Sequence, residues 1–423
     1  MKGYAVMKKL LSFLLCAVMA FSVISGTVFT AGMFDVSITS EAADYNKTML
    51  PYCYRKLTDE EKLAYLKIRT AFIDHKKSVD IEIPVETADK LINILMFADS
   101  MTSFNVPVGD SSIEYYYYEN TMTTSSMMFS YVYSKKNYDL LIQKADKAAD
   151  KIISKFTDKT TDYEKIKIIH DYIIDKTEYF NNNANSSIYD ALVKGNAKCD
   201  GYAHAFDYVC AKAGIRSCEA YGTARNENGS SEAHVWNKVY YNKKWYNVDV
   251  TWDDPVDNLK ENKSYKYFMI SDRAISATHT QEDKGFYVPA AKSEDADYYK
   301  KYGFYAKTLN EAKTIFADKA AEAAKKGRSS VTVRFSDEEL YNSAVKCFEE
   351  TNDMFSILER ASKKAGGTII DDGCLYEADN SCSYTYTIYF YFKGSRISDY
   401  YSDVKQLDSG TFDFLKELGL KTE

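Results

Sequence analysis

The spacing of apolar residues after Cys199 predicts a buried helix. From Tyr202 onward, apolar side chains recur every three or four residues, which is the period of one helical face. These residues are Tyr202, Ala205, Phe206, Val209, Cys210 and Ala213. Gly214 follows them and is typical of a helix end. The helix therefore begins at or just after Cys199, where a loop becomes a helix, whereas Cys210 lies on the apolar face and is expected in the core.

The chain around this helix is predicted to be a mixture of helices and strands. Before Cys199 the helical period recurs over residues 138–156, 163–175 and 188–193. After Gly214 the pattern changes to the two-residue alternation of half-buried strands, over residues 217–223, 233–241 and 245–252. We expect these strands to be antiparallel and to pack against the helix that begins at Cys199.

The two flanking regions show the same order of expected elements. After a capped helix that opens at 57–61, the N-terminal order is strand, helix, strand, strand, over residues 80–84, 87–98, 113–119 and 127–133. The C-terminal order is strand, two helices, two strands, over residues 331–335, 337–348, 354–365, 369–376 and 383–392. This repeat indicates two small α+β domains of similar build, and chance recurrence of a common unit is the alternative.

The first residues of the chain are typical of a secretory signal. Lys8 and Lys9 precede an almost unbroken apolar and small stretch over residues 10–28, and small and polar residues follow it. A retained membrane anchor is the alternative, and cleavage sites are offered both near Ala31 and at 42–43. Cys16 follows a leucine rather than a small residue, so we do not expect a lipoprotein.

Composition narrows the class of protein. The 423 residues are too many for one compact domain, and a net charge of −7 without long basic runs gives nucleic acid no binding surface. Removal of the signal leaves seven cysteines, and an odd number outside the cell requires a free thiol. Cys199 is the candidate for that thiol. Cys374 and Cys382 either form a disulfide or stay reduced. A reduced, buried state is expected for the remaining cysteines, which are Cys53, Cys210, Cys218 and Cys347.

Cys199 is placed to act as a nucleophile. The free N–H groups and positive end of a helix stabilise a thiolate at its first turn, and Lys198 adds a cation. The base would be His234, with Asp249 to orient its ring. If 242–243 form a two-residue hairpin turn, Asp249 is a diagonal neighbour of His234 on the same face of the sheet. A three-residue loop without a bulge would instead place the two residues on opposite faces of the sheet.

The other histidines fit chemistry less well. A zinc site formed by Cys199, His204 and His234 is the competing hypothesis, but residues five apart on a helix do not share a face. We expect no metal and no cofactor. No comparable partners are evident for three other histidines, which are expected to be structural or solvent-facing. They are His75, His170 and His279.

Cys199, His234 and Asp249 lie in segments that resemble the transglutaminase-like domain of secreted bacterial proteins. The segments are GNAKCDGYAHAF (195–206), EAHVWNKV (232–239) and WYNVDVTWDDP (245–255), with HDYII (170–174) before them and YFMISD (267–272) after them. The resemblance covers roughly residues 145–300. It implies a papain-like α+β core in which Cys199 is the nucleophile, His234 the acid and base, and Asp249 its orienter. The Cys199 backbone N–H would be one oxyanion donor, and the second is not identified.

The expected protein is therefore a secreted or cell-surface cysteine enzyme that transfers or hydrolyses the acyl group of amides in protein or cell-wall peptide substrates. Its expected fold class is α+β, a transglutaminase-like core flanked by two small α+β domains. The expected division is signal and leader over 1–43, N-terminal domain over 44–144, catalytic domain over 145–304 and C-terminal domain over 305–423. We expect no nucleic-acid partner and no membrane span after signal removal. The alternative is a non-catalytic extracellular binding or structural module, since the tyrosine-rich flanks suit contact with sugars or peptides.

Overall fold

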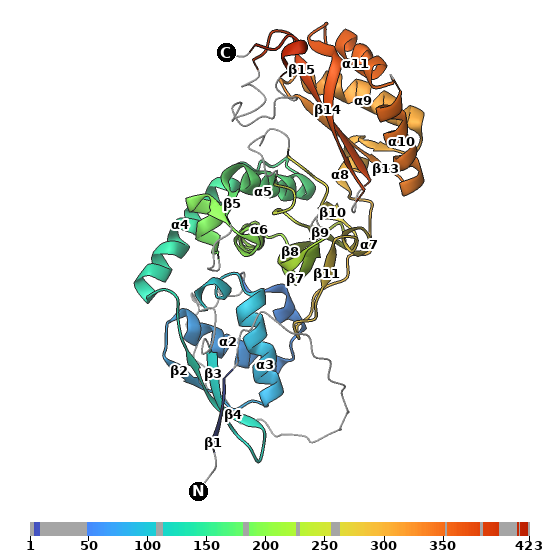
Figure 1. Cartoon of the computed structure of the whole chain (residues 1–423). Helices are drawn as coiled ribbons and strands as arrows, with labels where there is room; N and C mark the ends of the chain where they lie inside the picture. Colours follow the sequence, from blue (N-terminus) through green and yellow to red (C-terminus); the bar gives the residue numbers. More distant parts are fainter. Residues whose placement is uncertain are drawn as a thin grey trace.

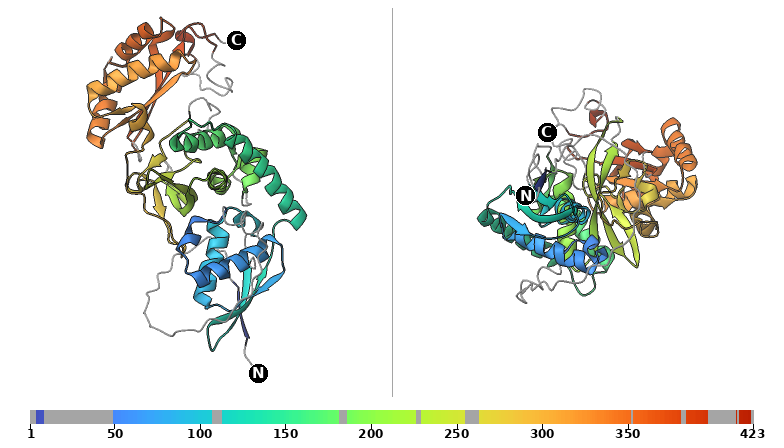
Figure 2. Two further views of the ribbon diagram at one scale, coloured as in Figure 1. Left: turned by 180° about the vertical axis from the view of Figure 1, so that it is seen from behind. Right: turned by 90° about the horizontal axis from the view of Figure 1, so that it is seen from below.

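Three units follow one another along the chain and lie in a row, with the central unit between the two flanking ones (Figures 1 and 2). The computed structural model describes residues 4–8, 49–106, 113–180, 186–225, 229–254, 263–351, 353–380, 384–396, 413 and 415–421. The predicted signal and leader lie outside these residues, apart from a short strand β1 (Tyr4–Lys8). Within the described part of the chain, no helix has both the length and the apolar character needed to cross a bilayer.

The N-terminal unit packs two helices against an antiparallel sheet. Its elements are η1 (Tyr52–Lys56), α2 (Asp59–Ile73), β2 (Ser78–Asp80), α3 (Val85–Asn93), η2 (Ile94–Ala98), η3 (Ser103–Asn105), β3 (Ile113–Tyr118) and β4 (Thr123–Phe129). The sheet order is β1-β3-β4-β2. The predicted cap is confirmed, because the side chain of Thr58 accepts from the Glu61 N–H and Glu61 bonds back to the Thr58 N–H. The expected strand 127–133 begins earlier, at Thr123, because a short turn follows β3.

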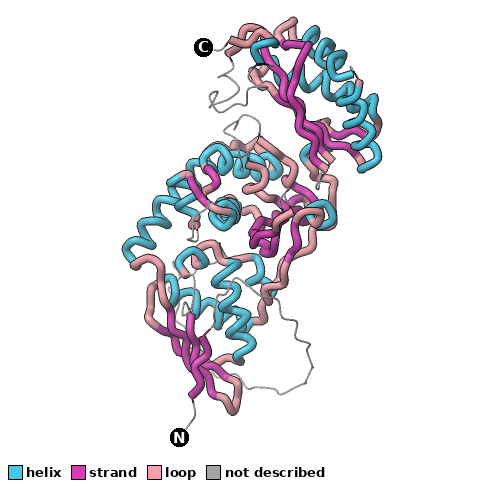
Figure 3. The backbone as a smooth tube through the Cα atoms, in the orientation of Figure 1, coloured by secondary structure: helices cyan, strands magenta, loops and turns pink. Residues whose placement is uncertain are grey.

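From residue 330 onward, the C-terminal unit has the predicted order of one strand, two helices and two strands. Its elements are β12 (Tyr305–Ala306), α9 (Leu309–Ala324), β13 (Ser330–Phe335), α10 (Glu338–Glu350), α11 (Asp353–Lys364), β14 (Ile369–Asp379) and β15 (Thr385–Phe392). The sheet order β12-β13-β15-β14 places the last strand between the two before it, as β4 lies between β2 and β3. The alanine-rich α9 was not predicted. The helices of the C-terminal unit lie on one face of its sheet (Figure 3).

The central unit packs helices against a five-stranded antiparallel sheet, which confirms the α+β class. Its helical elements are α4 (Lys135–Ile153), α5 (Asp162–Lys176), η4 (Asp190–Lys194), α6 (Cys199–Lys212), α7 (Asp272–Ile275) and α8 (Tyr298–Tyr302). Its strands are β5 (Glu178–Tyr179), β6 (Asn196–Ala197), β7 (Ser217–Arg225), β8 (Ser231–Tyr241), β9 (Lys244–Val248), β10 (Phe268–Ile270) and β11 (His279–Gln281). The order of the main sheet is β10-β9-β8-β7-β11. The buried core of this unit surrounds α6 and also takes in Met101 and Phe104 from the N-terminal unit.

The β8–β9 hairpin has the predicted register but a shorter second strand. Tyr241 pairs with Lys244, and the two residues between them have positive φ angles of 46° and 64°, as a two-residue type I′ turn requires. The expected strand 245–252 is wrong beyond Val248. Oδ1 of Asp249 accepts the backbone N–H groups of Thr251 and Trp252 at 3.0 and 3.2 Å, and this local turn ends the strand.

The described cysteines are free thiols. They are Cys53, Cys199, Cys210, Cys218, Cys347 and Cys374. The reduced state expected for Cys53, Cys210, Cys218 and Cys347 is therefore confirmed, although Cys347 is only half-buried. Cys374 is unpaired, and its suggested partner Cys382 lies outside the described residues.

Candidate active site

Cys199 lies at the first position of α6 and is half-buried, so its thiol is within reach of solvent. Lys198 occupies the cap position without a side-chain hydrogen bond to the helix, and in the first turn the Gly201 N–H donates to Oδ1 of Asp200 at 2.9 Å. The turn packs closely on the preceding loop. A Cβ on Gly201 would lie 2.7 Å from Cβ of Ala197 and 2.8 Å from Cβ of Ser186. Only glycine fits there, so the position of Cys199 is fixed by its neighbours.

His234 lies on β8, in the strand next to β7, and is 5% exposed. Its imidazole forms a hydrogen bond with the Cys199 thiol, and its Nε2 donates to Oδ2 of Asp249 at 2.7 Å. Burial opposes protonation of the ring, but the charge of Asp249 and the hydrogen bonds to Asp249 and Cys199 outweigh it. They raise the pKa of His234 to about 10. At neutral pH the ring is therefore an imidazolium next to the thiol.

Asp249 holds His234 from a buried position, being 1% exposed. Burial alone would raise the pKa of its carboxyl. The charge of His234 and hydrogen bonds from two histidines instead hold that pKa well below its usual range. One carboxylate oxygen accepts the two backbone N–H groups of the turn after β9, and the other faces the imidazoles. The structure thus brings the three predicted residues Cys199, His234 and Asp249 together.

His279 belongs to this cluster, which the sequence did not reveal. It lies on the edge strand β11, where it pairs with Ala224 of β7, and its Nε2 donates to the same Oδ2 of Asp249 at 2.9 Å. Its Nδ1 accepts from the Thr278 hydroxyl at 2.8 Å. The expectation that His279 has no comparable partner is therefore wrong. Burial and the charge of His234 lower the pKa of His279, so this second imidazole is neutral.

His234, Asp249 and His279 also form a group that could hold a metal ion, since their ligand atoms lie within 4.8 Å of one another. In the structure those atoms bond to one another instead. The zinc site considered with Cys199, His204 and His234 does not assemble. His204 contacts Glu219 through Nδ1 at 2.7 Å and the hydroxyl of Ser103, in the N-terminal unit, through Nε2 at 3.1 Å.

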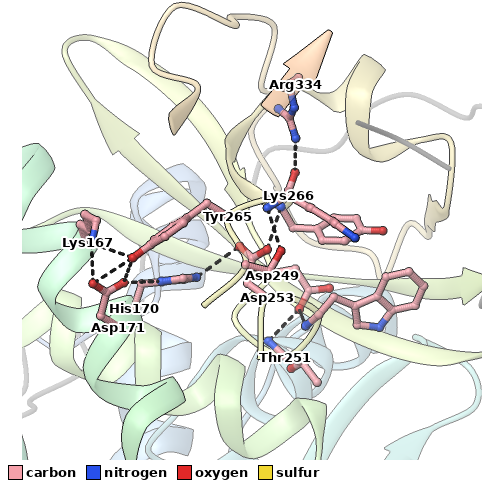
Figure 4. A network of polar contacts seen from close by, with 12 residues as sticks. Lys167, His170, Asp171, Asp249, Thr251, Asp253, Tyr265, Lys266 and Arg334 are labelled. Atoms are coloured by element: carbon pink, nitrogen blue, oxygen red, sulfur yellow. Dashed lines mark hydrogen bonds and ion pairs between the residues drawn. The ribbon is translucent and has the colours of Figure 1, made fainter. Parts of the chain in front are cut away.

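His170 forms a second buried histidine–carboxylate chain, which Figure 4 shows together with Asp249. Its Nδ1 contacts Oδ1 of Asp171 at 3.0 Å and its Nε2 contacts Oδ2 of Asp253 at 3.2 Å. Burial opposes its protonation, but the bonds and charges of the two carboxylates raise the pKa of His170. The expectation that it lacks a partner is also wrong. Because Asp253 accepts from the Tyr267 N–H at 3.0 Å, this chain fixes the segment that follows Asp249.

The contacts of His75 are with neutral groups, which include the side-chain amide of Asn105. Its ring nitrogens contact the carbonyl oxygens of Ile73 and Tyr133 at 3.2 and 3.1 Å, and the ring stacks on Tyr131. These contacts fit the structural role expected for it.

A groove of about 1440 Å³ begins at His234, the one member of the three predicted residues that lines it. His234, Thr251 and Trp252 form one end of its lining, and residues of the C-terminal sheet form the other. Substrate can therefore reach the imidazole from the space between the central and C-terminal units.

Comparison with known proteins finds relatives that are similar to part of the chain. The chain is 26% identical over 137 residues to human (Homo sapiens) Kyphoscoliosis peptidase, covering 28% of this chain and 21% of that protein. The mouse (Mus musculus) protein of the same name is 29% identical over 98 residues, covering 21% of this chain and 14% of that protein. The match therefore spans about a fifth or less of the length of these relatives.

Two solved structures are also similar to part of the chain. A structure described as a TGase is 16% identical, covers 30% of this chain and 41% of that chain, and has a TM-score of 0.24. The periplasmic domain of TgpA from Pseudomonas aeruginosa is 20% identical, covers 26% of this chain and 44% of that chain, and has a TM-score of 0.22. The family model described as the transglutaminase-like superfamily matches residues 147–250, the segment that carries Cys199, His234 and Asp249. The chain therefore contains a transglutaminase-like domain.

Proposed function

We propose that this chain is a cysteine-dependent enzyme that acts on amide bonds through a thioester on Cys199. The contact chain from the thiol through His234 to Asp249 supports this proposal most directly, because a buried carboxylate holds a protonated imidazole against a reachable sulfur. A thiolate next to an imidazolium is a strong nucleophile, and the imidazolium is also an acid for the leaving group.

The steps follow from these positions. The Cys199 thiolate attacks the amide carbonyl carbon, and the C–N bond breaks as the imidazolium of His234 gives its proton to the leaving amine. A thioester on Sγ remains. Neutral His234 then takes a proton from water or from an incoming amine, which attacks the thioester and releases the thiolate. The N–H of Cys199, at the first position of α6, would hold the carbonyl oxygen as it becomes negative.

The proposed substrates are protein or cell-wall peptide amides outside the cytoplasm, as residues 10–28 of the sequence indicate. The matched relatives are named as peptidases, which favours water as the acyl acceptor. Transfer to an amine uses the same thioester and differs only in the second step.

Alkylation with iodoacetamide tests the reactive thiol. At pH 6, mass spectrometry of the labelled peptides should show that Cys199 is modified at least ten times faster than the half-buried Cys347 of the same molecule. His234→Gln should remove this difference, while His75→Gln, which changes a histidine of the N-terminal unit, should preserve it. Equal rates at Cys199 and Cys347 in the unaltered protein would exclude the proposed chemistry.

The acceptor is tested with an unfolded glutamine-containing protein and a labelled primary amine. Incorporation of the amine mass shows transamidation, chain cleavage shows peptide hydrolysis, and a gain of about one mass unit per site shows deamidation. Each product should require Cys199 and should be lost in Cys199→Ala.

A further inference from the structure

The groove at the candidate site is larger than a pocket for one side chain. Its volume of about 1440 Å³ exceeds the range of roughly 300–1,000 Å³ found for small-molecule sites. It extends from His234, Thr251 and Trp252 to Thr332 and Thr387 on the C-terminal sheet. A substrate that fills it contacts two units of the chain.

The far wall of the groove is one face of the C-terminal sheet. On β13, Val333 belongs to the helix-covered core and Thr332 lines the groove, while Val331 belongs to the core and also borders the groove. On the adjacent β15, Ile388 belongs to the same core and Thr387 lines the groove. The hydroxyls of Thr332 and Thr387 lie 2.9 Å apart. The sheet thus offers a polar face with hydrogen-bonding groups to whatever occupies the groove.

This wall is fixed to the central unit by charged contacts. Nζ of Lys266 lies 2.8 Å from Oε1 of Glu377 and 3.0 Å from Oδ2 of Asp379. Arg334 of β13 forms an ion pair with the buried Asp297 and donates from Nη2 to the carbonyl oxygen of Lys266 at 2.8 Å (Figure 4). Since these pairs join both units next to the groove, the polar face is held opposite the candidate site.

The charges of the groove favour one kind of polymer. Five Lys and Arg residues and six Asp and Glu residues line it, so its formal charge is close to balanced. A polyanion such as a nucleic acid would meet as many carboxylates as cations. A polypeptide carries both backbone donors and acceptors and side chains of either sign, which such a lining can pair.

We propose that the C-terminal unit forms the second wall of a substrate groove that binds an extended polypeptide segment next to the target amide. This proposal rests on the proposed function, because it assumes that Cys199 attacks an amide of the bound polypeptide. It gives the C-terminal unit a role in substrate selection, whereby longer peptides bind better than short ones.

The length dependence can be measured without a known substrate. Mixed-sequence N-iodoacetyl peptides of two and eight residues place a thiol-reactive group at the end of a polypeptide. The rate of Cys199 alkylation, relative to that by iodoacetamide, should be at least fivefold higher for the eight-residue set. An iodoacetyl chitooligosaccharide of similar length should show no such gain. A gain for the oligosaccharide alone, or no gain for either polymer, would overturn the proposal.

Two matched substitutions locate the effect. Thr332→Trp fills the groove from the sheet face, whereas Thr314→Trp adds the same side chain at an exposed position of α9, a helix of the opposite layer. Thr332→Trp should reduce the eight-residue rate to that of the dipeptides, with the iodoacetamide rate unchanged, and Thr314→Trp should match the unaltered protein. A length gain that survives Thr332→Trp would also overturn the proposal. Ordinary reactivity of Cys199 with iodoacetamide would refute the enzyme function separately, since the length gain is a ratio.

Discussion

His279 donates a hydrogen bond of 2.9 Å from Nε2 to Oδ2 of Asp249, the same oxygen that accepts from His234. The Thr278 hydroxyl bonds to Nδ1 of His279, so Nε2 carries the proton of this neutral ring. With the N–H groups of Thr251 and Trp252 on Oδ1, Asp249 accepts from four donors. Its charge is therefore shared between two imidazoles and the backbone rather than directed at His234 alone.

His279→Phe should raise the pKa of His234. The substitution keeps an aromatic ring among Trp236, Trp252 and Tyr267 but removes one donor from the carboxylate. The remaining bond to His234 strengthens, which stabilises the imidazolium. One hydrogen bond is worth about 1 kcal/mol, so the titration midpoint should rise by roughly half to one pH unit. The five histidines of the chain allow this midpoint to be followed by NMR of the ring protons, assigned with His234→Gln.

Thr278→Val provides the control for this experiment. It leaves the His279 ring in place and removes the hydroxyl that fixes its tautomer, so the midpoint of His234 should move less than in His279→Phe. A midpoint that stays constant or falls in His279→Phe would show that His279 does not share the charge of Asp249.

The cluster was partly predictable because two of its contacts depend on local patterns. The helical period predicts that α6 starts at Cys199. The alternation of apolar and polar residues on both sides of 242–243 predicts the hairpin register that brings Asp249 to His234. His279 lies on a three-residue edge strand, which is too short to show any alternation. Its position depends on pairing with β7, more than fifty residues earlier in the chain, and no local pattern reports such a contact.

The same limit applies to His170 and to α9. The helical pattern places His170 on α5, but its acidic partner Asp253 comes from a loop held by long-range contacts. The pattern of α9 is weak because alanine is frequent in both exposed and buried positions of a helix. In contrast, the three longer strands of the C-terminal sheet, β13, β14 and β15, were predicted.

His170→Asn should destabilise the central unit in a pH-dependent way. The folded-state pKa of His170 is raised above its unfolded value of about 6.5, so its stabilisation is fully present below that value. It is lost as pH rises through the folded-state pKa. Loss of a buried charge that pairs with two carboxylates should cost about 3–5 kcal/mol at pH 6 and less at pH 9.

The three tryptophans of the chain make this measurement specific, because all of them lie in the central unit, at positions 236, 245 and 252. Urea unfolding followed by tryptophan fluorescence therefore reports on that unit. Asp253→Asn should add little in the His170→Asn background if the two residues act as a pair. Equal effects of His170→Asn at pH 6 and pH 9 would contradict the charged pair.

Asp207→Asn should stabilise the central unit at alkaline pH. Burial and the charge of Glu219 raise the pKa of Asp207 to about 7, and Ser217 donates to its Oδ1 at 2.6 Å. The folded state therefore holds a proton that the unfolded state releases near pH 4, so this group costs stability as pH rises from 4 to 7. Asparagine keeps the acceptor for Ser217 and removes the cost, which should gain roughly 2–4 kcal/mol at pH 8 and nothing at pH 4. The exposed Asp158→Asn is the control, and a gain at pH 4 would contradict the assignment.

Gly222→Ala should disturb the site through the edge strand. Gly222 of β7 pairs with His234 on one side and with Gln281 of β11 on the other. A Cβ at Gly222 would lie 1.9 Å from the backbone oxygen of Thr280, so β11 must move away and carry His279 with it. The His234 midpoint should then rise as in His279→Phe.

Gly214→Ala separates this effect from general strain at a glycine. Gly214 ends α6 with a φ of 73°, but a Cβ there would meet nothing within 4 Å. This substitution should cost about 1 kcal/mol of stability and leave the His234 midpoint unchanged, because it strains the backbone without touching β11. If Gly222→Ala lowers stability while the midpoint stays constant, His279 keeps its bond to Asp249 and the close approach of β11 to β7 serves packing alone.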